Sequence, residues 1–156
     1  MPARKLVHFF ATGFYSGLVP VMPGTAGTLV AIPLFLVISL FFSLFGYIVF
    51  TICFIFFSIW ISGIAETQAK RKDPREIVID EMAGFLVAMT ALPPRFTYIA
   101  AGFVLFRLFD ILKPFPIGII DKKLAGGKGI VLDDIVAGIY AHIAVQAGSR
   151  LISGVL

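Results

Sequence analysis

Five acidic residues stand at the edges of apolar segments in this sequence, in places where charged side chains are uncommon. None of them has a cysteine or histidine close by in the sequence. Clustered carboxylates without softer ligands suit a hard divalent cation, and Mg²⁺ is held by a few carboxylates together with water and substrate phosphate. The residue types therefore predict an Mg²⁺ site built from Asp80, Glu81, Asp110, Asp133 and Asp134.

Helix capping is the alternative explanation for the two acidic pairs. An acid at a helix N-terminus accepts hydrogen bonds from free N–H groups and suits the helix dipole. Capping accounts for one acid of Asp80/Glu81 and for one of Asp133/Asp134. It does not explain why a second acid stands beside each of them. It also leaves Asp110 unexplained, because that residue falls near the end of its apolar segment, where the dipole disfavours an acid.

Arg107, Asp110 and Lys113 are spaced three residues apart. On a helix they share one side, fanning over roughly 120° and rising about 9 Å. Two cations beside carboxylates indicate a clamp for phosphoryl oxygens next to a metal. The competing interpretation is an Arg and a Lys that extend toward the head groups around a local ion pair.

Residues 16–28 form an uncharged segment rich in Gly, Pro and Thr that leads into an apolar helix. Free N–H groups at such a helix start, together with hydroxyl groups, would bind an anion, so Gly24, Thr25 and Thr28 are candidate phosphate ligands. Thr25 could instead simply cap the helix. The economical mechanism for all these groups is attack of metal-activated water on a phosphomonoester. The base would be a carboxylate, with Asp80, Glu81, Asp110 and Asp134 as the candidate catalytic acids.

The composition places these groups in a membrane protein. Hydrophobic residues make up 59% of the 156 residues, and residues 6–65 contain no Asp, Glu, Lys or Arg. A soluble domain could not hide that much apolar length, so residues 1–156 are expected to form one integral membrane domain. The net charge of +4 requires no nucleic-acid partner. Its basic residues flank apolar segments, where they favour anionic lipid head groups and set orientation.

The apolar segments predict an all-α, multi-span fold with about five apolar helices and an N-terminal helix over 3–15 in the interface. If the N-terminus is cytoplasmic, the basic loops at 70–75 and 113–128 are cytoplasmic too, and the C-terminus lies outside. The candidate site residues then all lie at the cytoplasmic face. Two segments are shorter than the ~20 residues that span cleanly and are expected to tilt, re-enter or insert partway. The expected helices cover 27–42, 44–65, 77–92, 97–112 and 133–151.

Four motifs in this order resemble the phosphatidylglycerophosphatase A family of bacterial inner-membrane lipid phosphatases. They cover residues 13 to 138, nearly the whole chain. The motifs are Gly13-x-x-Ser16-Gly17 with Pro20 and Pro23-Gly24-Thr25-x-Gly27-Thr28; Asp80-Glu81-x-x-Gly84; Phe106-Arg107-x-x-Asp110-x-x-Lys113-Pro114-x-Pro116; and Gly127-x-Gly129 followed by Asp133-Asp134-x-x-x-Gly138.

This resemblance implies an all-helical fold and Mg²⁺-dependent hydrolysis of phosphatidylglycerophosphate to phosphatidylglycerol and phosphate. Within it, the five acids would serve the metal and the attacking water, and Arg107, Lys113 and Thr25 would hold phosphate. A small ion or metabolite transporter or channel subunit using the same acids is the alternative function, although transporter sites usually lie at the membrane midplane. A structural subunit whose charges only anchor it is a further possibility.

Overall fold

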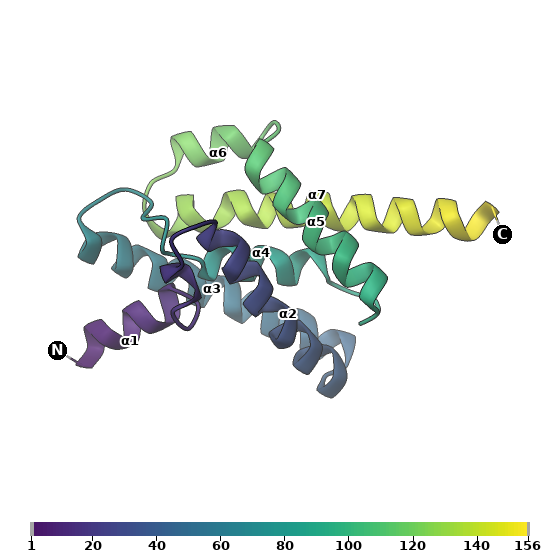
Figure 1. The fold of residues 1–156 in the computed structure, drawn as a ribbon, viewed down its shortest axis with the longest axis horizontal. Coiled ribbons are helices and arrows are strands. Elements are labelled where there is room, and N and C mark those ends of the chain that lie inside the picture. Colours follow the sequence, from purple (N-terminus) through teal and green to yellow (C-terminus); the bar gives the residue numbers. More distant parts are fainter. Residues whose placement is uncertain (1, 156) are drawn as a thin grey trace.

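The computed structural model describes residues 2–155, and the side chains of residues 4–151. All regular elements in this part of the chain are helices, which confirms the predicted all-α class (Figure 1). In chain order they are α1 (Pro2–Ala11), the short 3₁₀ helix η1 (Ser16–Leu18), α2 (Pro23–Phe41), α3 (Leu44–Ala69), α4 (Ile79–Ala88), α5 (Phe96–Leu112), α6 (Ile117–Lys123) and α7 (Gly126–Val155).

Within the described residues, three helices are long and apolar enough to cross a membrane. They are α2, α3 and the segment Gly126–Leu151 of α7, whose most apolar stretches have mean hydropathies of 2.1, 2.4 and 1.5, respectively. The expectation of about five apolar helices that span is therefore not confirmed. Helix α4 has only 10 residues and α5 has 17, which is short of the ~20 residues needed to cross the hydrocarbon core.

Helix α4 lies at the centre of the molecule and packs most extensively on α7, with further contacts to α2, α3 and α5. All of its residues except Glu81 and Val87 are buried. Close packing depends on two glycines, because a Cβ on Gly138 would stand 2.3 Å from the carbonyl oxygen of Gly84. A Cβ on Gly84 would in turn stand 2.6 Å from the Phe106 ring and 2.7 Å from the carbonyl oxygen of Asp134. The paired glycines thus fix the acid-bearing segments of α4 and α7 against each other.

Two helices begin earlier than the sequence predicted. Helix α7 begins at Gly126 rather than near Asp133, and Gly127 packs against α3 so closely that a Cβ would lie 1.9 Å from the carbonyl oxygen of Ile59. Asp133 and Asp134 therefore lie about two turns inside α7, and capping does not explain them. Helix α2 begins with Pro23 at its first position, and Met22 rather than Thr25 is its N-cap residue.

The ends of the predicted segments also differ in detail. Helix α1 ends at Ala11, before the predicted position 15, because the chain then turns through left-handed backbone at Gly13, Phe14 and Tyr15. The 113–128 loop contains the two-turn helix α6. Helix α3 continues past the predicted residue 65 to Ala69, and its polar last turns leave the apolar segment as expected.

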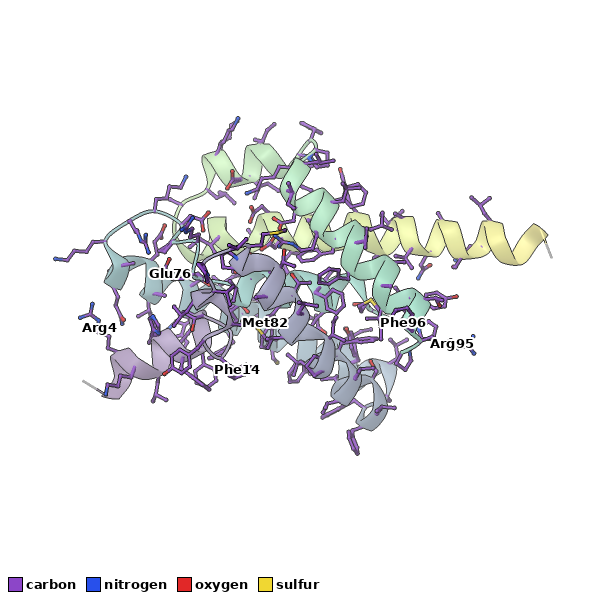
Figure 2. All side chains as sticks on the ribbon, viewed as in Figure 1. Arg4, Phe14, Glu76, Met82, Arg95 and Phe96 are labelled. Carbon is purple, nitrogen blue, oxygen red and sulfur yellow. The ribbon has the colours of Figure 1, made fainter. Side chains whose placement is uncertain are left out.

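Large apolar side chains cover the outer faces of α2 and α3, including Phe41, Phe45 and Phe56, which are 79%, 77% and 68% exposed. An apolar surface of this extent is typical of a face that contacts lipid. Figure 2 shows Arg4 and Glu76 toward one end of the molecule and Arg95 and Phe96 toward the other. Arg95, in the turn that precedes α5, therefore lies far from Arg4 in the basic N-terminal segment.

Candidate metal and phosphate site

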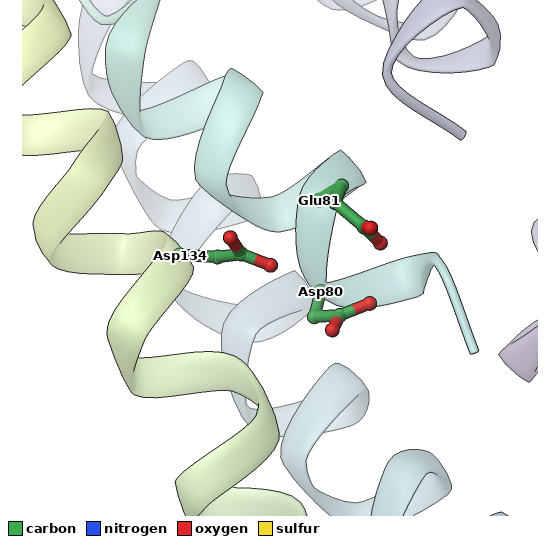
Figure 3. Close-up of side chains that lie close together, drawn as sticks. All are labelled: Asp80, Glu81 and Asp134. Carbon is green, nitrogen blue, oxygen red and sulfur yellow. The ribbon is translucent and has the colours of Figure 1, made fainter. Parts of the chain in front are cut away.

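Three of the predicted metal ligands form one compact group. Asp80 and Glu81 occupy the first turn of α4, and Asp134 approaches them from α7 (Figure 3). One carboxylate oxygen from each of the three lies within 4.8 Å of the others. Among the residues that the structure describes, this is the one group of three or more acids, histidines or cysteines close enough to share an ion.

The group is buried and incompletely paired. Asp80 and Asp134 are only 6% and 3% exposed. Oδ1 of each, together with Oε2 of Glu81, is buried without a hydrogen-bond partner. Carboxylates taken out of water cost several kcal/mol unless a proton or a cation compensates the charge. The arrangement therefore requires such a partner.

The titration behaviour of the two α4 acids reflects this environment. Burial raises the pKa of Glu81 to about 7, with the charge of Asp110 adding to the rise while the Asp80 hydrogen bond and the Arg107 charge oppose it. Burial and the neighbouring Glu81 raise the pKa of Asp80 well above its ordinary range. Without a cation, the group retains protons that a divalent ion would displace.

The donor set fits a hard divalent cation. Three carboxylates from two helices supply only oxygen ligands and leave positions open for water or substrate oxygen. The two histidines lie elsewhere in the fold. Nδ1 of His142 is 3.2 Å from the carbonyl oxygen of Ala88, at the other end of α4, and His8 lies on α1. An all-oxygen donor set of this kind suits a hard divalent cation better than a softer metal.

Arg107 borders this group from α5. Its Nη1 lies 2.6 Å from Oδ2 of Asp110 and 3.8 Å from Oε1 of Glu81. Its Nε is buried without a hydrogen-bond partner. Arg107 and Asp110, three residues apart on α5, thus form an ion pair at the edge of the site, which is the local ion pair of the competing interpretation. The guanidinium still has a donor available for an anion.

Lys113 is the C-cap residue of α5 and connects two further acids. Its Nζ lies 2.8 Å from Oδ2 of Asp133 and 3.0 Å from Oδ1 of Asp121. Burial lowers the pKa of Lys113, but the hydrogen bonds and charges of Asp133 and Asp121 raise it by more, so the net shift is upward. Lys113 and Asp133 therefore lie beside the compact group as an ion pair rather than within it.

The start of α2 closes the site on another side. A Cβ on Gly24 would lie 2.1 Å from Oε1 of Glu81 and 3.0 Å from Nη1 of Arg107. Oγ1 of Thr25 is buried and has no hydrogen-bond partner. Thr28 instead donates its hydroxyl hydrogen to the carbonyl oxygen of Gly24 at 2.9 Å. Of the two predicted threonine donors, Thr25 is the one left available to a ligand.

The predicted residues converge on one site from α2, α4, α5 and α7. Lys113, the residue that caps the end of α5, lies there too. Asp80, Glu81 and Asp134 make the compact group, whereas Asp110 and Asp133 border it, each paired with a cation. Asp121 was not among the sequence candidates, because it lies in a basic loop and no spacing relates it to Lys113. Only the placement of α6 against α7 reveals that contact.

Fold and site together define a helical, apolar protein that concentrates carboxylates beside an arginine and a helix N-terminus. Comparison with known families gives a match to the model described as Phosphatidylglycerophosphatase A over residues 9–149. The chain belongs to this family, whose members are phosphoric monoester hydrolases. The transporter alternative is not favoured.

Three curated relatives are similar over most of their length. Phosphatidylglycerophosphatase A of Haemophilus influenzae is 37% identical over 94% of this chain and 93% of its own. Phosphatidylglycerophosphatase A of Escherichia coli is 40% identical over 86% of this chain and 78% of its own. A Bacteroides thetaiotaomicron protein, provisionally named a phosphatidylinositol-3-phosphatase, is 36% identical over 90% of this chain and 92% of its own. No solved structure matches the chain.

Proposed function

We propose that the protein hydrolyses phosphatidylglycerophosphate to phosphatidylglycerol and phosphate, with Mg²⁺ as cofactor, at the cytoplasmic face of the bacterial inner membrane. The observation that carries the proposal is the juxtaposition of Asp80, Glu81 and Asp134, with unpartnered oxygens, beside Arg107 and the start of α2. Family membership supplies the lipid phosphomonoester substrate.

In the proposed site, Asp80, Glu81 and Asp134 hold the Mg²⁺ ion. When bound, the ion would act as a Lewis acid, offsetting charge on phosphoryl oxygens and making water a better nucleophile at neutral pH. The three acids are the ones whose oxygens lie close together, and the burial of Asp80 and Asp134 limits the access of bulk water. Asp133 stays paired with Lys113 and supports the group through the adjacent residue of α7.

Arg107 and the start of α2 bind the phosphate. The guanidinium of Arg107 presents its Nε donor, and the Thr25 hydroxyl is available to donate. Gly24 leaves room for an oxyanion next to the backbone of the first helical turn, where N–H groups and the helix dipole favour negative charge. These contacts strengthen as charge develops on the transferring phosphoryl group.

Asp110 is the carboxylate left to accept a proton from the attacking water. Arg107 occupies its Oδ2, so Oδ1 is the oxygen available as base. A bond forms between the water oxygen and phosphorus as Asp110 takes the proton of the water, and the bond from phosphorus to the glycerol oxygen breaks. The leaving oxygen takes up one proton from solvent, and Asp110 releases to solvent the proton that it accepted.

The proposed orientation follows from the basic segments. Arg4 lies toward one end of the molecule and Arg95 toward the other (Figure 2). The remaining cations of the N-terminal segment and of the 70–75 and 113–128 loops belong to segments predicted to lie on the same side of the membrane as Arg4. Cytoplasmic loops carry an excess of Lys and Arg. The test introduces a cysteine at Lys123 or Arg95 in a Cys53→Ser background and labels intact spheroplasts with an impermeant thiol reagent. Labelling at position 95 only is expected, and labelling at position 123 only would reverse the orientation.

The substrate test measures phosphate release by detergent-purified protein during an Mg²⁺ titration. Phosphatidylglycerophosphate is compared with phosphatidic acid, phosphatidylinositol 3-phosphate and a soluble phosphomonoester. The expected order places phosphatidylglycerophosphate first, and Asp134→Asn abolishes release, whereas Glu76→Gln, which alters a surface ion pair with Arg71, keeps it. Full activity of a folded Asp134→Asn variant would contradict the site, and preference for the inositol lipid would contradict the substrate.

A further inference from the structure

The ammonium group of Lys113 lies between two acids that come from different helices. Its Nζ is 2.8 Å from Oδ2 of Asp133 on α7 and 3.0 Å from Oδ1 of Asp121 on α6. The side chain of Asp133 is 8% exposed, whereas that of Asp121 is 33% exposed. Asp133 is therefore the inner partner of Lys113, and Asp121 is the outer one.

The packing of α6 determines where Asp121 points. Ile117, the first residue of α6, is fully buried, and Asp121 follows it by four residues, which places both side chains on one face of the helix. Tyr140 of α7 holds the segment before α6, because its hydroxyl donates to the carbonyl oxygen of Phe115 at 2.9 Å. The fold thus presents Asp121 to Lys113, and their contact is not a chance meeting of two surface side chains.

Asp133 stands next to Asp134, the member of the compact group that α7 supplies. Neighbouring residues on a helix point about 100° apart, so the two carboxylates project on different sides of α7. On the Asp134 side, Gly84 and Gly138 set the distance between α7 and α4. On the Asp133 side, the contact is to Lys113. Contacts on both sides fix the rotation of α7 about its axis, and this rotation decides where the Asp134 oxygens lie.

We propose that Asp121 is a positioning residue for the compact acidic group, an inference that rests on the proposed Mg²⁺ site. Asp121 holds the flexible side chain of Lys113 on Asp133 and so keeps the neighbouring Asp134 directed at the two acids of α4. Oδ1 of Asp133 is buried without a hydrogen-bond partner, so Lys113 is the group that fixes this carboxylate. Loss of an interaction that orients metal ligands lowers metal affinity by about 10- to 100-fold.

The test compares Asp121→Asn with Asp121→Glu and with the control Asp73→Asn. Asp121→Asn removes the charge that holds Nζ, whereas Asp121→Glu keeps a carboxylate at a partly exposed position that can accommodate it. The charge of Asp73 also acts on Lys113 and on Asp80, but the structure shows no ion pair between Asp73 and Lys113. Asp73 has a φ of 44°, which asparagine adopts as readily as aspartate. Asp73→Asn therefore changes the local charge by the same amount and leaves the bridge intact.

The affinity for Mg²⁺ is measured from the rise in melting temperature of the detergent-purified protein during an Mg²⁺ titration. Asp121→Asn is expected to raise the apparent Kd for Mg²⁺ about tenfold, and Asp121→Glu is expected to recover most of the affinity. Asp73→Asn is expected to bind Mg²⁺ as the unaltered chain does. Unaltered Mg²⁺ binding by Asp121→Asn, even with a lower melting temperature in chelator, would overturn the proposal, and so would an equal loss in Asp73→Asn.

A Lys113→Met background tests whether Asp121 acts through Lys113. Adding Asp121→Asn to this background is expected to cause no further loss of Mg²⁺ affinity, because the bridge is already broken. An equal loss in both backgrounds would show that Asp121 acts independently of Lys113 and would overturn the positioning role. If Lys113→Met does not fold, the Asp121 variants alone decide the proposal.

Phosphate release is measured separately, so that the proposed function and the role of Asp121 are tested apart. Asp121→Asn is expected to keep the KM for the lipid at saturating Mg²⁺, because Asp121 is paired with Lys113 and is not placed at the phosphate. An unaltered chain that binds Mg²⁺ but releases no phosphate would contradict the proposed function, while the binding results still decide the role of Asp121. An unaltered chain that binds no Mg²⁺ would overturn the metal site and the positioning role together.

Discussion

The α-carbon of Gly24 lies against the carboxylate of Glu81, so close that a methyl group there would stand 2.1 Å from Oε1. The same methyl group would stand 3.0 Å from Nη1 of Arg107. One residue without a side chain therefore lets the start of α2, the start of α4 and the end of α5 meet. This contact explains why a Pro-Gly-Thr segment far from the acids in sequence belongs to their site.

Gly24→Ala should remove most activity while leaving the protein folded. The added methyl group displaces the ends of two flexible side chains, Glu81 and Arg107, rather than backbone. A displacement of about 1 Å in such a site costs about 100-fold in rate. The control is Gly63→Ala, since the nearest atom to its added Cβ is 3.5 Å away. Phosphate release and thermal unfolding in detergent are measured together, and a fully active Gly24→Ala variant would contradict the placement of α2.

Arg107→Gln should lower kcat/KM by about 100-fold, the effect of removing one preorganised donor. The change leaves Asp110 and Glu81 without their common cation. Arg107→Lys should recover part of the loss because it keeps the charge but not the planar fork. Arg71→Gln, which alters a surface ion pair with Glu76, should be as active as the unaltered chain. Equal activity of all three variants would exclude a phosphate-binding role for Arg107.

The thermal stability of the Mg²⁺-free protein should fall as the pH rises. The pKa of Glu81 is raised from 4.5 to about 7, so the folded chain binds this proton more tightly than the unfolded chain. The resulting stabilisation is complete below the unfolded pKa of 4.5 and is lost as the pH rises through about 7. Melting in detergent with a chelator, at about pH 5 and about pH 8, measures this loss.

Adding Mg²⁺ should restore stability at the higher pH and have little effect at the lower one, because the ligands bind the ion in their ionised form. Glu81→Gln should remove the share of the pH dependence that Glu81 carries, while the buried Asp80, whose pKa is also raised, keeps the rest. A melting temperature that rises with pH in the chelated protein would contradict the assignment.

Gly138→Ala should destabilise the protein by about 1–3 kcal/mol, the usual cost of forcing extra volume into a packed interior. Its Cβ would stand 2.3 Å from the carbonyl oxygen of Gly84, and backbone atoms cannot move aside as a side chain does. Helices α4 and α7 would separate, and the oxygens of Asp80 and Asp134 with them. Denaturation in mixed micelles measures the change against the Gly63→Ala control. An unchanged free energy of unfolding would show that the α4–α7 contact is adaptable.

The sequence alone predicted the kind of chemistry and the kind of fold. The five acids and Arg107 were identifiable because ionised side chains are costly beside apolar segments and persist there mainly for function. The apolar segments themselves predicted helices, since backbone groups in lipid must satisfy their hydrogen bonds within the segment. The substrate was indicated by the resemblance of the four motifs to a known family and not by the chemistry of the residues.

Only the tertiary structure decided which acids meet and which helices are long enough to cross a membrane. Asp134 approaches Asp80 because Gly84 and Gly138 allow close packing, whereas Asp110 is held by Arg107 at the border. Helix α7 begins at Gly126 because Gly127 fits against Ile59 of α3, a contact between residues far apart in the chain. Apolar periodicity does not encode such contacts, because the positions of helix ends and the crossing of helices depend on packing partners elsewhere in the sequence.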